Sequence, residues 1–494
     1  MNTKKVQILN LFKNRYFHYS VFLIVVFTTQ FSSISIEVVD WDESTFFIIS
    51  KYVSEGKILY LDYWDSKPPL MFFYLASMFK IFGPSLLIGR LAGDLLIFLI
   101  IIHVYKILNN FYNLNICFFS SLFLIYLFSY EASQPTMTEH LGILFIVVSI
   151  DFVFKKNNIV NLIIIGILFS LSFNTRNNLA FACIAISIYL LFIKKIKVRS
   201  FKWVFVGFII PICFISVYFF IKSSFKYYFY MLFQLPFQTT QTYRMNFNEF
   251  IDQILSILNL DQYISIELII IVTLLITIII TNSKFSNLTS FNIDLLNYLI
   301  IFFLTISIIF GGRLFNHYLI QLFPSLAIIF ASTLNYFSKN KLIMLFVTFF
   351  VVLLNINLFT VGLNNLSNYQ NIRNNYKIAL MSDNLRADNN TSFLALENHL
   401  IFFYNDFIKQ FKVVHPSSLT NPVRNKDIFD SLKKLGLVEN DQFLEFVENK
   451  PDYIFCENNC ELYIDQSYYV QNYFLLEEVD GLKLFQKNRA QVNN

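Results

Sequence analysis

The residues best suited to chemistry lie between the first two long apolar runs of the chain. Three carboxylates, Asp40, Asp42 and Glu43, fall within four positions, and Asp65 and Lys67 follow before a pair of prolines. A carboxylate can take a proton from an acceptor hydroxyl, and a nearby ammonium group can stabilise a departing phosphate. Together they provide what a group transfer from an anionic lipid requires.

These residues also have a structural interpretation. Asp40, with Glu43 three positions later, resembles a capping box at a helix start, and Lys67 before Pro68 is compatible with a solvated side chain. Capping accounts for two of the acids but not for the third, Asp42, at a predicted boundary between water and lipid. We therefore expect the segment to be functional.

Further ionisable residues occur where later apolar runs begin or end. Glu139 and His140 open one run, Arg176 closes the next, and Arg313 and His317 lie between two others. Charged side chains at helix ends can reach the interface without any function, and a single His is usually only hydrogen-bonded. Their predicted location on one side of the membrane favours a shared function.

The composition excludes several classes of protein. Of 494 residues, 56% are hydrophobic and only 14% are charged, whereas about 25% charged residues is usual in a soluble domain. The 60 Phe and 28 Tyr residues also exclude a disordered chain. The net charge of +5 is scattered between apolar runs, so it predicts membrane topology and not a nucleic-acid partner.

About eleven apolar segments approach the 20 residues that a helix needs to cross the hydrocarbon core. We expect a mainly α, polytopic transmembrane helix bundle over residues 17–363. The predicted spans are 17–37, 85–105, 113–130, 138–154, 158–174, 178–193, 203–221, 264–281, 295–311, 317–336 and 342–361.

The basic residues set the expected orientation. Segment 1–16 and the basic connections would be cytoplasmic, and the first connection, 39–84, which holds the acids, would be extracytoplasmic. Within it, Phe46, Ile49 and Val53 recur at helical spacing, which predicts helices along the membrane surface. We expect a multi-pass protein of the bacterial inner membrane with its C-terminus outside. The basic connections lie near 106, 155–156, 194–199, 284 and 339–341.

Residues 364–494 carry more charge and predict a small extracytoplasmic α/β domain, because short apolar runs alternate with helical patterns. Cys456 and Cys460 could form a disulfide in an oxidising compartment or remain two free thiols. The predicted strands are 392–396, 412–414 and 453–455, and the predicted helices are 399–411 and 426–436.

The order of the motifs resembles the GT-C superfamily of integral-membrane glycosyltransferases, in particular bacterial members similar to aminoarabinose lipid A transferases and protein O-mannosyltransferases. The resemblance is dense over residues 40–95 and recurs at 136–140 and 311–324. The residues that carry it are 41–43, Gly56, 63–69, 82–84, Arg90, 313–318 and 321–324.

The resemblance implies roles for individual residues. Asp42, beside Glu43 in the acidic motif, would be the catalytic carboxylate that activates the acceptor. Ser66 stands where some relatives have Glu, which weighs against a metal at that position. Lys67 would contact the donor phosphate, and Arg313 and His317 would contact the phosphate or a metal. Arg176, at the end of an apolar run, is a further candidate phosphate contact from its position alone. Support for the acceptor or for a divalent cation would come from Asp65, Glu139 and His140.

Family members generally use a polyprenyl-phosphate sugar and invert the anomeric centre. An inverting displacement needs one base and a stabilised leaving group, whereas retention usually needs a second carboxylate as nucleophile. We expect an inverting hexosyl- or pentosyltransferase that uses a polyprenyl-phosphate-linked sugar. Its acceptor would be lipid A, a glycan or a protein hydroxyl, and its partners would be membrane lipids and not nucleic acid.

Three other classes of protein compete with this hypothesis. A transporter or flippase usually places ionisable groups near the bilayer midplane and often shows two symmetric halves. A polysaccharide polymerase or ligase also handles lipid carriers, but we expect its motifs in a large later loop. A binding module anchored by the spans would need only one of them.

Overall fold

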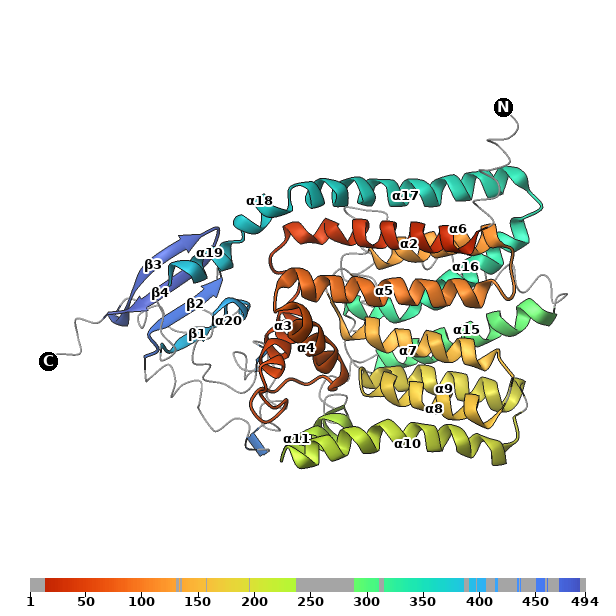
Figure 1. The fold of residues 1–494 in the computed structure, drawn as a ribbon, viewed down its shortest axis with the longest axis horizontal. Coiled ribbons are helices and arrows are strands. Elements are labelled where there is room, and N and C mark those ends of the chain that lie inside the picture. Colours follow the sequence, from red (N-terminus) through yellow and green to blue (C-terminus); the bar gives the residue numbers. More distant parts are fainter. Residues whose placement is uncertain are drawn as a thin grey trace. The chain divides into compact units, whose positions relative to one another are not determined.

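The computed structural model (Figure 1) forms two compact units, which are described separately. Unit 1 comprises Met1–Ser33, Arg90–Ile215 and Tyr243–Ser367, and unit 2 comprises Ile34–Gly89, Ser216–Thr242 and Asn368–Asn494. The structure describes residues 14–129, 133, 136–156, 158–194, 196–236, 288–310, 315–385, 391–396, 398–405, 414–415, 433–434, 436, 450–457, 460 and 471–488.

Unit 1 is a bundle of helices. Helix α7 packs on α8, α9 on α15, α6 on α16, and α2 on α17. The long helices are α2 (Arg15–Gln30), α5 (Leu86–Leu108), α6 (Leu114–Phe128), α7 (Thr138–Val153), α8 (Ile159–Phe173), α9 (Ala180–Ile188), α10 (Val198–Ile221), α15 (Leu288–Phe310), α16 (Phe323–Phe337) and α17 (Lys341–Ser367). Short 3₁₀ segments η1 (Phe31–Ser35), η3 (Asn177–Leu179) and η6 (Asn316–Leu322) and the π-helical segment η4 (Tyr189–Ile193) extend or connect them.

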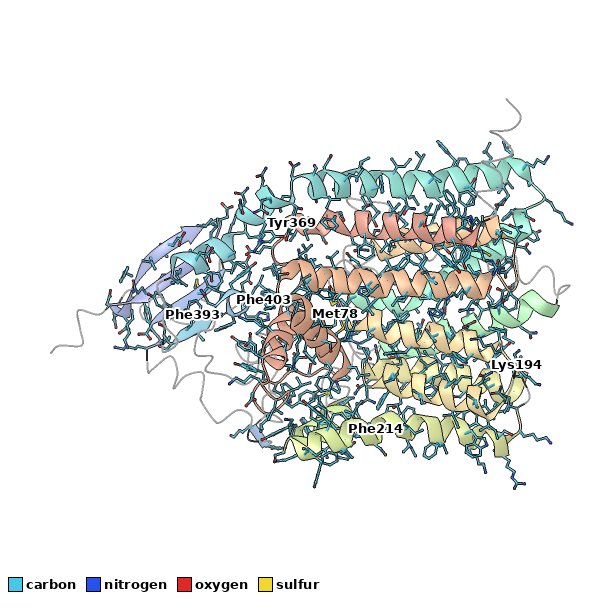
Figure 2. All side chains as sticks on the ribbon, in the orientation of Figure 1. Met78, Lys194, Phe214, Tyr369, Phe393 and Phe403 are labelled. Atoms are coloured by element: carbon cyan, nitrogen blue, oxygen red, sulfur yellow. A yellow bond between two sulfur atoms is a disulfide. The ribbon has the colours of Figure 1, made fainter. Side chains whose placement is uncertain are left out.

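The predicted spans coincide with these helices, except for 264–281, which lies outside the described residues. Within the described part of the chain, six helices are long and apolar enough to cross a membrane, whereas α6 and α8 are shorter. The outer faces of the bundle helices are apolar, as at Phe214 on α10, whose side chain is 75% exposed (Figure 2). Such exposed apolar surface is typical of contact with lipid, so the mainly α, polytopic fold class is confirmed.

Asparagine side chains start several of the helices. Asn14 accepts a hydrogen bond from the backbone of Tyr16 at the start of α2, and Asn113 and Asn158 do the same for α6 and α8. An N-cap side chain satisfies a backbone N–H that has no partner within the helix. The abundant Asn, which suggests no chemistry in the sequence, therefore contributes to the helix boundaries.

Glycines allow backbones to approach closely in unit 1. A Cβ atom built on Gly166 of α8 would overlap the carbonyl oxygen of Val204 in α10, and one built on Gly207 would overlap that of Ile163. Gly362 of α17 similarly faces the carbonyl oxygen of Thr28 in α2. Small residues at such contacts are typical of helices that associate in lipid, where van der Waals packing holds them together.

Unit 2 combines short helices with a four-stranded sheet. The strand order is β1-β2-β4-β3; β1 runs parallel to β2, and the other pairs are antiparallel. Its elements are α3 (Trp41–Ser54), α4 (Leu70–Phe82), α11 (Phe225–Phe229), η5 (Tyr230–Gln234), α18 (Tyr369–Asn374), α19 (Lys377–Asn384), α20 (Ile401–Tyr404), β1 (Phe393–Ala395), β2 (Tyr453–Glu457), β3 (Tyr473–Val479) and β4 (Leu482–Lys487).

The predicted strands at 392–396 and 453–455 correspond to β1 and β2. Of the helix predicted at 399–411, the structure has only the four residues of α20, and 406–411 lie outside the described residues. Residues 412–413 and most of 426–436 lie outside the described residues, and Val414 is in no strand. The structure pairs Cys456 and Cys460 in a disulfide.

The hairpin of β3 and β4 is absent from the sequence-based prediction. Asp480 and Gly481 connect the strands with φ values of 47° and 86°, as a two-residue type I′ turn requires. An Asp-Gly pair between apolar runs is a strong hairpin signal, so the sequence contained enough information to predict this turn.

We expect Gly166→Ala to destabilise the protein by about 1–3 kcal/mol, because a new methyl group would force the backbones of α8 and α10 apart. Gly142→Ala is the matched control, since its methyl group would overlap only the terminal carbon of the Leu179 side chain and no backbone atom. Thermal unfolding in detergent compares them. Equal melting temperatures for the two variants would contradict the close approach.

Candidate active site

The start of α3 positions the first acidic motif. Asp40 is the N-cap residue, and its carboxylate accepts a hydrogen bond of 2.6 Å from the backbone N–H of Asp42. Asp42 and Glu43 then occupy the first turn, where the helix dipole favours negative charge. The capping interpretation of Asp40 is therefore correct, and it leaves the Asp42 side chain available for other contacts.

A tightly held loop positions Lys67. The buried Tyr60, which has a φ of 68°, donates a hydrogen bond from its hydroxyl to the Lys67 carbonyl oxygen at 2.7 Å. Asp65 accepts one from the Lys67 backbone N–H at 2.9 Å. The fully buried Trp64 anchors the loop, and its carbonyl oxygen accepts a hydrogen bond from the backbone of Val414. Aromatic burial and backbone hydrogen bonds together fix the loop.

Asp42 lies between two basic side chains. Its Oδ2 atom is 3.0 Å from Nζ of Lys67, and its Oδ1 atom is 3.0 Å from Nε2 of His415. The three side chains are only 14–18% exposed. An ion pair in such partly desolvated surroundings is stronger than one in open water. We call Asp42, Lys67 and His415 the Asp42 cluster.

Two more carboxylates border the Asp42 cluster. Burial, reinforced by the nearby Asp42 charge, raises the pKa of Asp40 to about 6. Burial also raises the pKa of Asp65, which is 2% exposed, although the charges of Lys67 and His415 oppose that shift. Burial thus opposes ionisation of both carboxyl groups, and the charge of Lys67 partly offsets this effect.

A second group of ionisable residues lies in unit 1. Oε1 of Glu139, at the start of α7, is 2.9 Å from Nη2 of Arg176, and Oε2 accepts a hydrogen bond from Thr138. Nε2 of His317, in η6, lies 3.9 Å from the same Oε1 atom. The guanidinium of Arg176 lies 5.0 Å from the ring centroid of Tyr318. We call Glu139, Arg176 and His317 the Glu139 cluster.

The structure thus brings Asp65 and Lys67 to Asp42, and brings Arg176 and His317 to Glu139. Buried Glu43 lies close enough to Asp40 to help raise its pKa. The ring of buried His140 contacts the backbone N–H of Met137 and the hydroxyl of Ser133, so it belongs to the start of α7. Arg313 lies outside the described residues.

The sequence analysis did not identify His415 or its neighbour His399. His399 lies 2.7 Å from the hydroxyl of Thr45 on α3, and its ring centroid is 6.1 Å from that of His415. His415 directly follows a segment predicted as a strand, and chain positions after regular elements often carry functional residues. That position was the available signal, although nothing local could indicate a pairing with Asp42.

Among the described residues, no group of three His, Cys, Asp or Glu side chains is arranged to hold a metal ion. In the Asp42 cluster, both oxygen atoms of Asp42 already contact basic side chains. These residues do not fit a bound divalent cation as they stand.

Comparisons with known proteins agree with the fold. Residues 66–220 match the family model described as dolichyl-phosphate-mannose-protein mannosyltransferase. No curated protein matches the sequence.

Several solved structures are similar. ArnT from Cupriavidus metallidurans bound to undecaprenyl phosphate has a TM-score of 0.65 at 12% identity, covering 95% of this chain and 98% of that one. The apo state of ArnT has a TM-score of 0.49 at 13% identity, and the match covers 94% of this chain and 97% of that one. A third similar structure is the archaeal oligosaccharyltransferase AglB from Archaeoglobus fulgidus, in complex with an inhibitory peptide and a dolichol-phosphate. It has a TM-score of 0.41 at 10% identity, and the match covers 97% of this chain and 75% of that one.

The match begins at Ser66, so it includes Lys67 but not Asp42, Tyr60 or Asp65. This chain is a multi-pass membrane protein with the fold of ArnT, and its residues 66–220 resemble the dolichyl-phosphate-mannose-protein mannosyltransferase family.

Proposed function

We propose that this protein is an inverting glycosyltransferase that moves a sugar from a polyprenyl phosphate to a hydroxyl acceptor. The observation that carries the proposal is the Asp42 carboxylate, which lies 3.0 Å from both Lys67 and His415 at the start of α3. This arrangement places one base next to cationic groups, as an inverting transfer from a phosphate requires.

Asp42 would act as the general base. It accepts the proton of the acceptor hydroxyl while the hydroxyl oxygen attacks the anomeric carbon of the sugar. The bond between that carbon and the phosphate oxygen breaks, and polyprenyl phosphate leaves with the electron pair. One carboxylate suffices because the displacement has a single step.

Lys67 would connect donor binding to the activation of Asp42. Its ammonium group now pairs with the Asp42 carboxylate, and such a pair makes the carboxylate a weaker base. A donor phosphate that attracts Lys67 would release part of this pairing and increase the basicity of Asp42. His415 would keep the second Asp42 oxygen in place, and Asp65 would position Lys67 through its backbone hydrogen bond.

We propose phosphate-binding roles for Arg176, His317 and Arg313. Arg176 suits this role because its guanidinium can form two parallel hydrogen bonds to phosphate oxygens. Glu139 would orient Arg176 through their ion pair of 2.9 Å. The family resemblance also assigns Glu139 to support of the acceptor or a metal, and Glu43 to the catalytic motif; we propose the same support from His140, which follows Glu139.

The donor carrier is proposed from the ArnT structure, which contains undecaprenyl phosphate. The apolar surfaces of the helices suit its tail. We further propose that the reaction occurs at the outer face of a bacterial inner membrane, with the N-terminus in the cytoplasm. Lipid A, a glycan or a protein hydroxyl could each act as the acceptor.

Asp42→Asn should lower the transfer rate by about 10²–10⁴-fold, the usual contribution of a general base, while leaving donor binding intact. Asp40→Asn is the matched control, since Asn caps a helix as well as Asp does. A membrane assay with radiolabelled lipid-linked sugars measures both variants. Full activity of Asp42→Asn would show that another group is the base.

Lys67→Ala should weaken binding of polyprenyl phosphate by roughly tenfold or more, because a charge-assisted hydrogen bond contributes about 1.5–3 kcal/mol. Lys57→Ala, at an exposed lysine of the same loop, should bind normally. Binding of the purified protein to polyprenyl phosphate in detergent can be titrated directly. If both variants bound alike, Lys67 would not contact the donor.

His415→Leu should lower kcat by about tenfold with little change in the donor KM, because Asp42 would lose a polar partner. His415→Gln retains an N–H donor and should recover part of that loss. Steady-state kinetics of the two variants give the comparison. An increase in donor KM at unchanged kcat would instead assign His415 to donor binding.

A further inference from the structure

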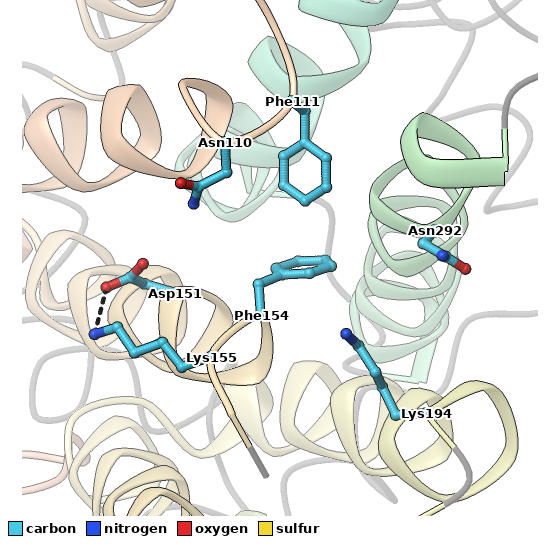
Figure 3. A pocket seen from close by; sticks show the side chains of 7 residues that line it. All are labelled: Asn110, Phe111, Asp151, Phe154, Lys155, Lys194 and Asn292. Carbon is cyan, nitrogen blue, oxygen red and sulfur yellow. Dashed lines mark ion pairs between the residues drawn. The ribbon is translucent and has the colours of Figure 1, made fainter.

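A cavity lies at one end of the helical bundle of unit 1, at the opposite end of α7 from Glu139. Its volume is about 470 Å³, within the range of small-molecule sites. Asp151 lies twelve positions after Glu139 on α7, or about 18 Å along the helix. The cavity is therefore separate from the Glu139 cluster. It is lined by Asn110, Phe111, Asp151, Phe154, Lys155, Lys194 and Asn292 (Figure 3).

The lining has one excess positive charge. Lys155 pairs with Asp151 at 3.0 Å, so these two charges compensate each other. Lys194 forms no ion pair with any described carboxylate, and its Nζ atom lies 5.1 Å from the ring centroid of Phe154. Figure 3 shows its amine directed into the space between Phe154 and Asn292. The charge of Lys194 therefore faces the cavity.

The rest of the lining is polar on some walls and aromatic on another. Asn110 and Asn292 offer amide groups that can donate and accept hydrogen bonds. The rings of Phe111 and Phe154 meet edge to face, with centroids 5.0 Å apart. Such a lining suits a ligand that has a charged group, hydroxyls and an apolar portion.

We propose that this cavity binds the phosphodiester headgroup of an anionic phospholipid. Lys194 would contact the phosphate, and Asp151 and Asn110 would accept hydrogen bonds from headgroup hydroxyls. Phe111 and Phe154 would contact the glycerol and the first methylenes of the acyl chains. This inference does not depend on the proposed transfer reaction.

The charges favour a hydroxyl-bearing headgroup over one that carries an ammonium group. Asp151 is already neutralised by Lys155, so a second ammonium group beside it would be repelled by Lys155. A hydroxyl can still donate to the carboxylate without adding charge. Phosphatidylglycerol has this combination of an anionic phosphodiester and free hydroxyls, whereas phosphatidylethanolamine does not.

The location favours a lipid as the source of the phosphodiester. The cavity lies where α7 and η4 end and α15 begins, beside the basic connections near 155–156 and 194–199 that are predicted to be cytoplasmic. Figure 2 places Lys194 at this end of the bundle. Basic pockets between membrane helices are typical sites for anionic headgroups.

The proposal can be tested with the full-length protein, delipidated in detergent and titrated with phosphatidylglycerol by native mass spectrometry. Lys194→Gln should weaken binding by roughly tenfold or more, because it removes a charge-assisted contact, and Lys194→Arg should retain most of it. Lys202→Gln is the matched control. Lys202 also lies over an aromatic ring, 5.0 Å from the centroid of Trp203, but does not line the cavity.

Two further ligands test whether the phosphodiester belongs to a lipid or to a soluble molecule, and which headgroup the cavity prefers. Soluble glycerophosphoglycerol should compete only weakly; competition as strong as that of the lipid would overturn a lipid ligand in favour of a soluble phosphodiester. Phosphatidylethanolamine should bind more weakly than phosphatidylglycerol, and the reverse order would overturn the charge argument. Equal phosphatidylglycerol binding by Lys194→Gln and Lys202→Gln would show that this cavity is not the binding site. Melting temperatures near that of the unchanged protein would verify that both variants fold.

Discussion

Charge compensation is the constraint on which the functional part of this structure depends. In a chain that is 56% hydrophobic, an ionised group that leaves water without a partner is strongly unfavourable. Asp42 meets that requirement through Lys67 and His415, and Glu139 meets it through Arg176. Because each partner comes from a different segment, the loop before α4 and the chain around 415 must be held in place for the charges to be compensated.

The sequence predicted the features that arise locally. Long apolar runs predicted the helices, because a helix in lipid forms all of its backbone hydrogen bonds internally and needs only apolar side chains on its outer surface. Asp40, Asp42 and Lys67 were identified because they lie close together in the chain and beside recognisable turn residues. Glu139, Arg176 and His317 were each identified as helix-end residues, and the structure shows that they form one cluster.

The remaining features depend on contacts between distant segments. His415 pairs with Asp42 across 373 positions of sequence, and no periodicity or spacing can report such a pair. The close approach of α8 to α10 at Gly166 also appears only when both backbones are placed. The β3–β4 hairpin is different: its Asp-Gly turn is a local signal that the sequence analysis overlooked.

Helix length is consistent with the lipid-linked donor proposed for the Glu139 cluster. Helices α7 and α8 have 16 and 15 residues, or about 22–24 Å, whereas the hydrocarbon core is about 30 Å thick. On the proposed topology, their basic ends near Lys155 lie at the cytoplasmic surface, so Glu139 and Arg176 would stop several ångströms short of the outer surface. A phosphate on a membrane-embedded carrier could then meet Arg176 without leaving the bilayer. The low local dielectric would strengthen the contact between them.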